Sequence, residues 1–402
     1  MVVVWRRRLG MLVGVLWCAA ILIASCGDND SEPAASTTAP ESGASSAEGP
    51  LEVESLVWSR VDLDDAVFPP GSSVNDIVAG GPGLVAVGAT YHADADEGVE
   101  YATIWTSADG LAWSQVRYDE NVFGVDVEIN GVTVGGPGLV AVGGTSVWTS
   151  DDGVSWSQVP DLDLDPIYDD MRGVIAGGPG LVAFGQTNGE AAVWTSADGL
   201  TWSRVADDKG VFEASRLHAV SEGGPGLVAV GVSETTFPEV VPVIWTSGDG
   251  AEWSRVPHDG TVFGPPGDLY IWDVIAADTG LVAVGYGPVS ETDDSMNGIV
   301  WTSPDGVAWS RVPHDEAVFG GDRGEGMLSV AEFDGGLVAV GSRFGPVIWA
   351  SPDGDNWSRM PYDSASLGEA LGMGKVVAGG PGLVVLGGAD EGPALWVAAQ
   401  QE

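Results

Sequence analysis

The chain has 402 residues, and its 58 acidic against 15 basic side chains give a formal net charge of -43 at pH 7. So acidic a surface repels nucleic acid and anionic lipid headgroups, which excludes a DNA- or RNA-binding role. We expect this charge to serve solubility outside the cell; a cation-rich partner is the alternative.

The first 25 residues have the features of an export signal. Residues 6–8 are all arginine, and residues 11–23 form an apolar stretch too short to be a stop-transfer helix. Residues 23–26 read IASC, which resembles the lipobox of bacterial lipoproteins, where the cysteine is acylated and begins the mature chain. An ordinary signal peptide with a chance cysteine at Cys26 is the alternative. The arginines also resemble a twin-arginine signal, so the export route stays open.

These features divide the chain into three parts: a lipoprotein signal peptide at 1–25, a lipidated Cys26 with a linker at 26–50, and a folded body at 51–402. The linker is rich in Ala, Ser, Thr, Glu and Pro, which is typical of a disordered tether. The other cysteine, Cys18, lies in the signal, so the exported body is expected to hold no disulfide. We expect a monomer on the extracytoplasmic face of the cell membrane, attached by its lipid alone.

The folded body is a sevenfold repeat. Seven runs close to GLVAVG alternate with seven runs close to WSRV. The tryptophans that open the latter recur 43 to 56 residues apart, at Trp58, Trp113, Trp156, Trp202, Trp253, Trp309 and Trp357. Self-similarity at this period is typical of repeat folds.

Each repeat predicts four short strands. In the first complete repeat they are residues 76–79, 84–87, 103–107 and 113–116, with a GGPG turn at 80–83. The second strand, LVAV, is apolar on both faces and must therefore be covered on both sides. Because glycine and β-branched residues dominate every segment, helix is expected to be nearly absent.

Seven four-stranded antiparallel sheets buried on both faces predict an all-β fold, a seven-bladed β-propeller. The body opens with a lone fourth strand at 56–61 and finishes with a first, second and third strand that end at 394–397. Together these pieces make one blade. We therefore expect the N-terminal strand to pair with the C-terminal sheet and close the ring.

A Ser-x-Asp-Gly-x-x-Trp sequence between the third and fourth strands resembles the Asp-box, or BNR repeat, of sialidase-like propellers, with one residue fewer between Asp and Gly. It occurs in six blades, at Asp109, Asp152, Asp198, Asp249, Asp305 and Asp353. In the family the box caps a hairpin at the blade periphery and is structural. An aspartate can accept N–H bonds across its own turn, glycine takes the positive φ, and tryptophan packs back. One aspartate per blade indicates a structural role rather than metal binding or catalysis.

One face of the ring is expected to carry the function. The GGPG and Ser-x-Asp-Gly turns lie on one face and barely change in length, whereas the second-to-third and fourth-to-first links vary and lie on the other. Binding residues are commonly found on loops held by a rigid scaffold. We call this second side the variable face.

One position near the variable face changes from blade to blade. Aligned on the GGPG turns, the residues that enter the innermost strands are Asn75, Asn130, Arg172, His218, Trp272, Leu328 and Gly374. They are expected to ring the mouth of the central channel. The candidate ligand-binding residues are Asn75, Asn130, Arg172, His218 and Trp272, because this set suits stacking on, and hydrogen bonding to, a sugar or other polar ligand. Simple divergence around a water-filled channel is the alternative.

The sequence contains only incomplete metal-binding patterns, and we expect neither a metal nor a cofactor. Aspartates at 161, 163 and 165 look like the opening of a calcium loop, but the glycine and terminal glutamate are missing. A second acidic cluster at 94–100 has the same weakness. Exposed acidic loops explain both better.

The Asp-box resemblance implies one alternative function, a sialidase-like glycoside hydrolase. Such enzymes need three arginines around a carboxylate, a tyrosine–glutamate nucleophile pair and an acid aspartate. Residues off the repeat pattern that could contribute are Arg117, Arg172, Arg216, Arg323, Arg343, Tyr168 and Tyr270. The family's arginine motif near the first strand has no counterpart here, and the family ring has six blades.

We therefore favour a non-catalytic function. The expected protein is a membrane-anchored, extracytoplasmic binding or interaction module whose variable face takes a glycan, a peptide or an envelope partner. A purely structural envelope protein is a third alternative, because fold-level analogy does not carry an activity across.

Overall fold

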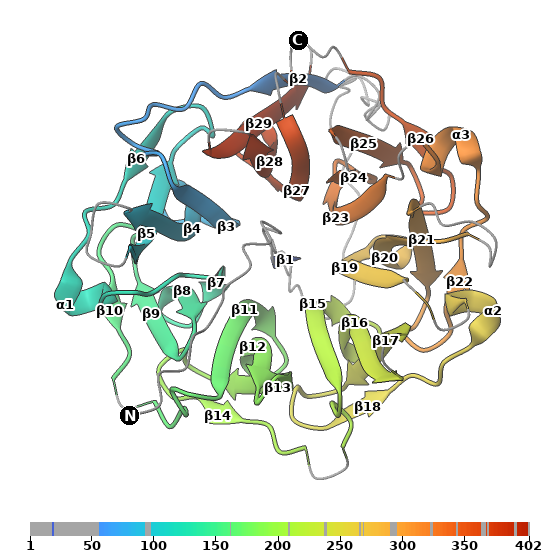
Figure 1. Cartoon of the computed structure of the whole chain (residues 1–402), viewed down its shortest axis with the longest axis horizontal. Helices are drawn as coiled ribbons and strands as arrows, with labels where there is room; N and C mark the ends of the chain where they lie inside the picture. The colour runs from blue at the N-terminus through green and yellow to red at the C-terminus, as the bar shows by residue number, and fades with distance from the viewer. Residues whose placement is uncertain are drawn as a thin grey trace, which may run out of the picture.

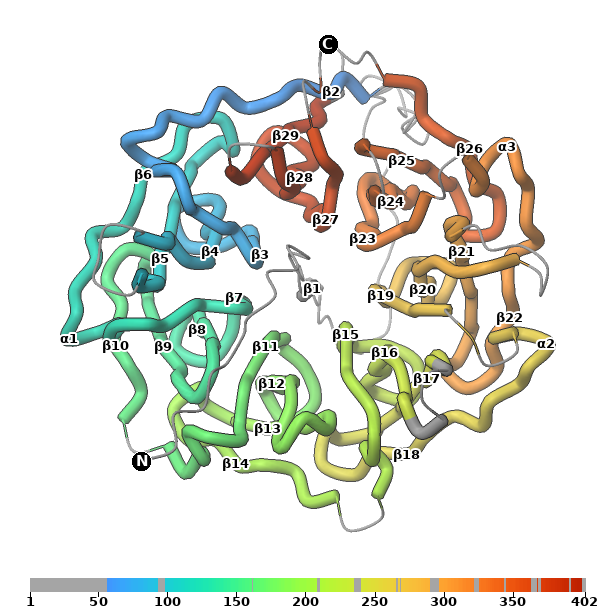
Figure 2. Tube along the Cα trace, viewed as in Figure 1, coloured from blue at the N-terminus to red at the C-terminus, as the bar shows by residue number. Residues whose placement is uncertain are grey.

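A computed structural model shows a ring of seven sheets around a central axis (Figures 1 and 2). The residues that it describes are 18–19, 56–92, 98–160, 162–207, 210–236, 239–264, 267, 269–289, 296–321, 325–342, 345–362, 367, 370–389 and 392–400. The ring is an all-β, seven-bladed propeller, as the repeat predicts.

Each blade is a four-stranded antiparallel sheet with its first strand nearest the axis. Blade 1 consists of β3 (Ser72–Gly80), β4 (Gly83–His92), β5 (Val99–Ser107) and β6 (Trp113–Gln115). Blade 2 consists of β7 (Gly131–Gly135), β8 (Gly138–Gly143), β9 (Ser146–Ser150) and β10 (Ser157–Gln158). Blade 3 consists of β11 (Asp169–Gly177), β12 (Gly180–Thr187), β13 (Glu190–Ser196) and β14 (Ser203–Arg204).

The next three blades repeat this order. Blade 4 consists of β15 (Ser215–Gly223), β16 (Gly226–Thr236), β17 (Glu239–Ser247) and β18 (Trp253–Arg255). Blade 5 consists of β19 (Tyr270–Ala277), β20 (Gly280–Gly287), β21 (Asn297–Ser303) and β22 (Ser310–Arg311). Blade 6 consists of β23 (Gly326–Phe333), β24 (Gly336–Ser342), β25 (Pro346–Ser351) and β26 (Ser358–Arg359).

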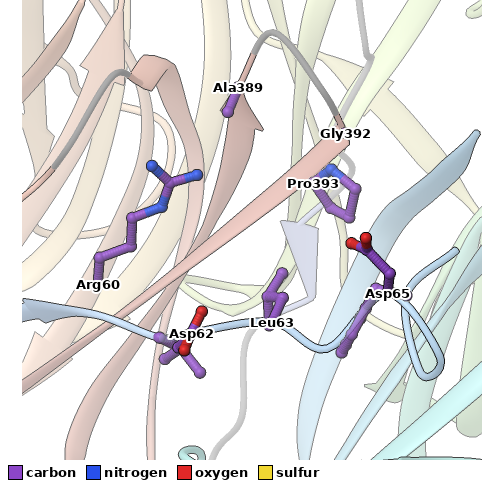
Figure 3. Close-up of a pocket in the computed structure, with 9 residues that line it drawn as sticks. Arg60, Asp62, Leu63, Asp65, Ala389, Gly392 and Pro393 are labelled. Carbon is purple, nitrogen blue, oxygen red and sulfur yellow. The ribbon is translucent and has the colours of Figure 1, made fainter. Parts of the chain in front are cut away.

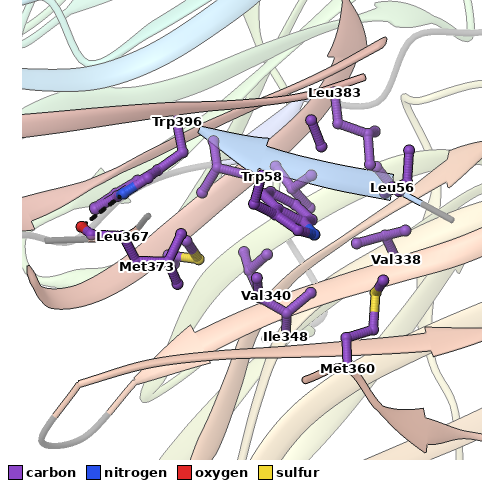
Figure 4. Close-up of a cluster of buried hydrophobic side chains, with 14 of the residues drawn as sticks. Leu56, Trp58, Val338, Val340, Ile348, Met360, Leu367, Met373, Leu383 and Trp396 are labelled. Carbon is purple, nitrogen blue, oxygen red and sulfur yellow. Dashed lines mark hydrogen bonds between the residues drawn. The ribbon is translucent and has the colours of Figure 1, made fainter. Parts of the chain in front are cut away.

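Blade 7 joins the two ends of the body, which confirms the predicted closure. Its inner strands are β27 (Ala370–Gly379), β28 (Gly382–Ala389) and β29 (Gly392–Gln400), and its outer strand is β2 (Leu56–Arg60), antiparallel to β29. Figure 4 shows Trp58 of β2 among the buried side chains that join this blade to blade 6, close to Val340 and Ile348. The hydrophobic contact therefore locks the closing strand to two blades.

The core lies between neighbouring blades. Each hydrophobic cluster combines the facing sides of two adjacent sheets, such as Val85 of blade 1 with Leu139 of blade 2. The tryptophans of the seven third strands are all 0% exposed: Trp105, Trp148, Trp194, Trp245, Trp301, Trp349 and Trp396. Replacing a buried side chain of this size by alanine typically costs about 3–5 kcal/mol.

The Ser-x-Asp-Gly turns have the predicted internal bonds. In blade 2, Asp152 Oδ1 accepts from the backbone nitrogens of Ser155 (2.6 Å) and Val154 (2.8 Å), and Trp156 Nε1 donates to Gly153 O at 3.0 Å. Gly153 has a φ of 76°. The two backbone donors lower the pKa of Asp152 to about 2. The carboxylate is thus used within its own turn, as expected of a structural residue.

The fourth-to-first links are less variable than expected, because each of five contains a repeated Val-Phe pair a few residues after the fourth strand ends. The valine carbonyl accepts the indole N–H of the next third-strand tryptophan, as from Trp105 to Val67 O at 2.7 Å, and Phe68 stacks on the same indole with ring centroids 5.0 Å apart. The five buried phenylalanines are Phe68, Phe123, Phe212, Phe263 and Phe319. Only the remainder of each link varies.

Three of these links form single helical turns: α1 (Glu120–Phe123), α2 (Gly260–Phe263) and α3 (Glu316–Phe319). Each is capped by an aspartate whose side chain accepts a backbone N–H of the first turn. Within the described ranges, no helix is long and apolar enough to cross a membrane.

The N-terminal segment contributes one two-residue strand, β1 (Cys18–Ala19). It pairs in parallel with Ala219 and Val220 of β15 and lies at the centre of the ring in Figure 1. The rest of the expected signal peptide, Cys26 and the linker lie outside the described residues, so the signal and lipidation sites stay predictions.

Candidate functional site

Six of the seven residues singled out by the repeat alignment share one structural position, a β-bulge on the innermost strand. The register of the inner strand shifts between Leu217 and Ala219, which leaves His218 without a paired residue on β16. Five other inner strands shift at the same place, around Asn75, Arg172, Trp272, Leu328 and Gly374. A bulge redirects its extra side chain out of the sheet's alternation. The side chains at these positions therefore lie outside the alternating pattern that repeats from blade to blade.

The bulge explains the last glycine of each GLVAVG run. A Cβ on Gly231 would lie 1.9 Å from the carbonyl oxygen of Arg216, because the bulge pushes that backbone against the second strand. The corresponding distance is 1.9 to 2.1 Å at Gly88, Gly143, Gly185, Gly285, Gly341 and Gly387. The repeat thus encodes the bulge in its second strand, while the residue on the bulge is free to differ.

Asn75 and Asn130 tie neighbouring blades together. Asn75 Nδ2 donates to Glu128 Oε1 (2.7 Å) and to Ile129 O (2.9 Å) in the segment that enters blade 2. Asn130 precedes β7 rather than lying on a bulge, and its Nδ2 donates to Met171 O of blade 3 at 3.0 Å. Both side-chain nitrogens therefore already bond to the neighbouring blade, and the side-chain carbonyl oxygens are the atoms that could bond to a ligand.

Arg172 lies beside carboxylates on blade 3. Its Nε contacts Asp170 Oδ2 at 2.8 Å, and Gln186 Nε2 donates to the same oxygen at 3.1 Å. Burial raises the pKa of Glu128, the bond from Asn75 opposes this shift, and Asp170 adds to it. A partly buried carboxylate with a raised pKa favours a hydrogen-bond donor or a cation nearby. We call Asn75, Glu128, Asn130, Asp170 and Arg172 the polar half.

Aromatic side chains gather on blades 4 and 5. His218 and Trp272 stack with ring centroids 4.3 Å apart and planes 9° apart. Tyr270 and Tyr286 lie on Trp272, with centroid distances of 6.1 and 6.0 Å, and face each other at 5.3 Å. We call these four residues the aromatic half. Such rings offer a broad, rigid surface for an apolar or planar group.

The aromatic half also contains two unusual polar groups. His218 Nδ1 lies 2.6 Å from Ile271 O, and burial lowers the pKa of His218 to about 4, so the ring is neutral at pH 7. The indole nitrogen of Trp272 is buried and has no hydrogen-bond partner among the residues that the structure describes. An unsatisfied buried donor costs about 1–3 kcal/mol, and a ligand acceptor that reached it would recover part of that cost.

Two of the arginines considered for a sialidase-like site, Arg172 and Arg216, pair with carboxylates of their own blades. Arg216 pairs with Glu234 at 3.2 Å, as Arg172 does with Asp170. Arg323 and Arg343 lie outside the described residues. Tyr168 is 49% exposed in the link before β11, away from the inner strand that carries Tyr270. The described residues thus do not show a three-arginine clasp.

The acidic loops show local bonding. Asp165 Oδ1 accepts from Ile167 N at 2.9 Å, and Asp169 Oδ2 accepts from Asp165 N at 2.9 Å. Asp161 and most of the 94–100 cluster lie outside the described residues. In the part of the chain that the structure describes, no three His, Cys, Asp or Glu side chains form a group that could hold a metal ion.

The sequence alignment found the bulge residues but did not assign their neighbours two positions earlier to the binding site; Tyr270 was named only as a candidate for the hydrolase alternative. Glu128, Asp170 and Tyr270 each lie two residues before a singled-out position, on the same strand or its entry. A signal was available, because this earlier position varies as well and is a glycine in blades 6 and 7 only. Aligning two more columns of the repeat would have found most of both halves.

Comparison with known proteins supports the fold. No known family and no curated protein matches the sequence. A solved structure of YCF48 bound to a D1 peptide matches with a TM-score of 0.55 and 16% identity, over 88% of this chain and 97% of that one. At this identity the likeness shows the β-propeller fold alone.

Two further solved structures are similar at lower scores. Sqt1 from Chaetomium thermophilum has a TM-score of 0.46 and 13% identity, over 83% of this chain and 98% of its own. The β-propeller domain of the Trilobed protease from Pyrococcus furiosus has a TM-score of 0.44 and 11% identity, over 82% and 97% of the two chains.

Proposed function

We propose that this chain is a non-catalytic binding module that takes a peptide or protein segment across the mouth of its channel. The observation that carries the proposal is the contrast between the polar half and the aromatic half, which we place at the mouth of the channel. Six blades share one bulge, yet the bulge residues include an asparagine, an arginine, a histidine and a tryptophan. Closure of the ring does not require different residues at these bulges, so we attribute the differences to ligand binding.

The chemistry of the two halves suits an extended chain with mixed side chains. An aromatic or apolar side chain would pack on Trp272 and Tyr286, while a donor or cation would approach Glu128 and Asp170. The similar YCF48 structure holds a peptide, which is consistent with this choice of ligand. The bound segment would therefore carry an aromatic and a basic residue.

A sialidase-like hydrolase remains the weaker candidate. The Ser-x-Asp-Gly turns that resemble the Asp-box use their aspartates internally, and Arg172 and Arg216 are engaged by Asp170 and Glu234. A fluorogenic sialoside is the direct test. Turnover that disappears in Arg172→Ala would favour the hydrolase over the binding module.

We also propose that the module is exported and anchored by a lipid on Cys26, on the extracytoplasmic face of the membrane. The IASC sequence after an apolar stretch supports this placement. Cleavage there would remove residues 1–25, including β1. Metabolic labelling with an alkyne-bearing palmitate should mark the wild type and not Cys26→Ser; equal labelling of both would contradict lipidation.

Selection from a random peptide library on the purified full-length protein tests the binding function. Selected peptides should lose at least about tenfold in affinity for Trp272→Ala and for Arg172→Ala, which corresponds to about 1.4 kcal/mol. Leu111→Ala is the matched control, because Leu111 is 53% exposed in a turn on the opposite face. Failure to enrich any peptide, or equal binding to all variants, would refute the proposal.

A further inference from the structure

A cavity of about 360 Å³ lies where the ring closes, between the residues that follow β2 and the facing ends of β28 and β29 (Figure 3). It opens on the variable face, since both a fourth-to-first link and a second-to-third link contribute to it. The residues that line it are Arg60, Val61, Asp62, Leu63, Asp65, Phe68, Ala389, Gly392 and Pro393. Its walls thus come from the two ends of the folded body.

Three charged side chains line this cavity. Figure 3 shows the Arg60 guanidinium on one side and the Asp65 carboxylate on the other, with Asp62 and Leu63 between them. Within the described part of the chain, these three charged side chains form no hydrogen bond or ion pair. Three other fourth-strand arginines have partners: Arg204 donates to Thr187 at 3.3 Å, Arg255 donates to Ser215 at 2.6 Å, and Arg359 pairs with Glu325 at 2.7 Å.

The base of the cavity is apolar and rigid. Phe68 is 5% exposed and is held between Trp105, with centroids 5.0 Å apart, and Trp113, at 6.3 Å. Leu63 packs against the same cluster, and Pro393 adds a fixed ring from the opposite wall. The apolar surface therefore needs little rearrangement to receive a side chain, which lowers the entropic cost of binding.

We propose that this seam cavity binds a small zwitterion of amino-acid size. A ligand carboxylate would meet Arg60, a ligand ammonium would meet Asp62 and Asp65, and an apolar side chain would lie on Leu63 and Phe68. A ligand with only a negative charge would be repelled by the two aspartates, and a ligand with only a positive charge would be repelled by the guanidinium of Arg60. The volume is at the lower end of the range for small-molecule sites.

Binding at this place has a consequence for stability. The ligand would bridge the segment after β2 and the facing ends of β28 and β29, which are the two walls of the closing blade. A molecule that binds only the folded ring raises its stability by mass action. We therefore expect the zwitterion to raise the temperature of unfolding as well as to bind.

Calorimetric titration of the purified full-length protein with L-leucine tests the proposal. N-acetyl-L-leucine lacks the ammonium, and L-leucinamide lacks the carboxylate. Each should bind at least about tenfold more weakly than L-leucine, because each loses one charge-assisted contact. Arg60→Gln should weaken leucine binding to the same extent, and Asp62→Asn with Asp65→Asn should do so together.

Two control variants separate the seam cavity from other sites. Arg204→Gln changes the same fourth-strand position in blade 3, and Trp272→Ala changes the channel mouth; both should keep leucine binding and the rise in unfolding temperature. The proposal is overturned if leucine does not bind at millimolar concentration, if all three ligands bind equally, or if Arg60→Gln binds as the wild type does. Loss of binding in Trp272→Ala alone would place the ligand at the mouth instead.

Discussion

Replacing Lys375 by methionine removes a buried ion pair that joins the last inner strand of the ring to the first. Lys375 on β27 contacts Asp76 on β3, 299 residues away in the chain, and the two side chains are 1% and 2% exposed. The same aspartate accepts Ile77 N and Val132 N at 2.9 Å, so one carboxylate joins blades 7, 1 and 2. Methionine keeps the apolar stem and removes only the ammonium.

The expected cost is about 3–5 kcal/mol, because the change leaves a buried carboxylate without its counter-charge. That is a large share of the roughly 5–15 kcal/mol that stabilises a typical domain. Adding Asp76→Asn to Lys375→Met removes the uncompensated charge and keeps an oxygen that can accept an N–H. The double variant should therefore regain at least about 1 kcal/mol over Lys375→Met.

Urea unfolding followed by tryptophan fluorescence measures these differences. The midpoint should fall for Lys375→Met with the slope unchanged, since the surface exposed on unfolding stays the same. Arg204→Gln, whose side chain is 54% exposed, is the control and should stay within about 0.5 kcal/mol of the wild type. A loss below about 1 kcal/mol for Lys375→Met, or no recovery in the double variant, would refute the reasoning.

Two further predictions concern the bulges. Burial lowers the pKa of His218 from 6.5 to about 4, so the unfolded chain takes up this proton first and stability falls as the pH drops from about 6.5 to about 4. His218→Phe should remove roughly 2–3 kcal/mol of that loss, measured by urea unfolding at pH 7 and pH 4.5; an unchanged difference would contradict a neutral buried histidine. Gly231→Ala places a Cβ 1.9 Å from Arg216 O and should cost at least about 3 kcal/mol. Gly388→Ala, where a Cβ would have no neighbour within 4 Å, should cost little; equal thermal shifts would argue against the close approach.

The fold was predictable because the same pattern of strands and turns occurs seven times in the sequence. A second strand apolar on both faces requires cover on both sides, and a lone fourth strand at the start completes the three strands at the end. Local bonding within the Ser-x-Asp-Gly turns was equally predictable, since each turn closes within a few residues, as from Gly153 N to Ser150 Oγ at 2.9 Å. The Val-Phe pairs were also visible in the sequence, but their contact with the next blade's tryptophan was not.

The candidate site was only partly predictable. Comparison of the repeats with one another identified Arg172, His218 and Trp272 as exceptions, and the structure places all three on bulges. The comparison of the repeats did not show that His218 stacks on Trp272, because that contact depends on how two neighbouring sheets are rotated about the axis of the ring. Nor did it show that Glu128 lies against Asn75, which comes from a different blade.

The number of blades, the way the ring closes and the positions that vary from blade to blade could all be predicted from the amino-acid sequence. These properties depend on hydrophobic periodicity and on turns that form within each repeat. The tertiary structure alone decided which differing residues meet. Lys375 and Asp76, or Arg60 and Pro393, are hundreds of residues apart and come together only when the last blade takes up the first strand. Contacts between residues so far apart in the chain form only when the ring closes, so no local sequence pattern predicts them.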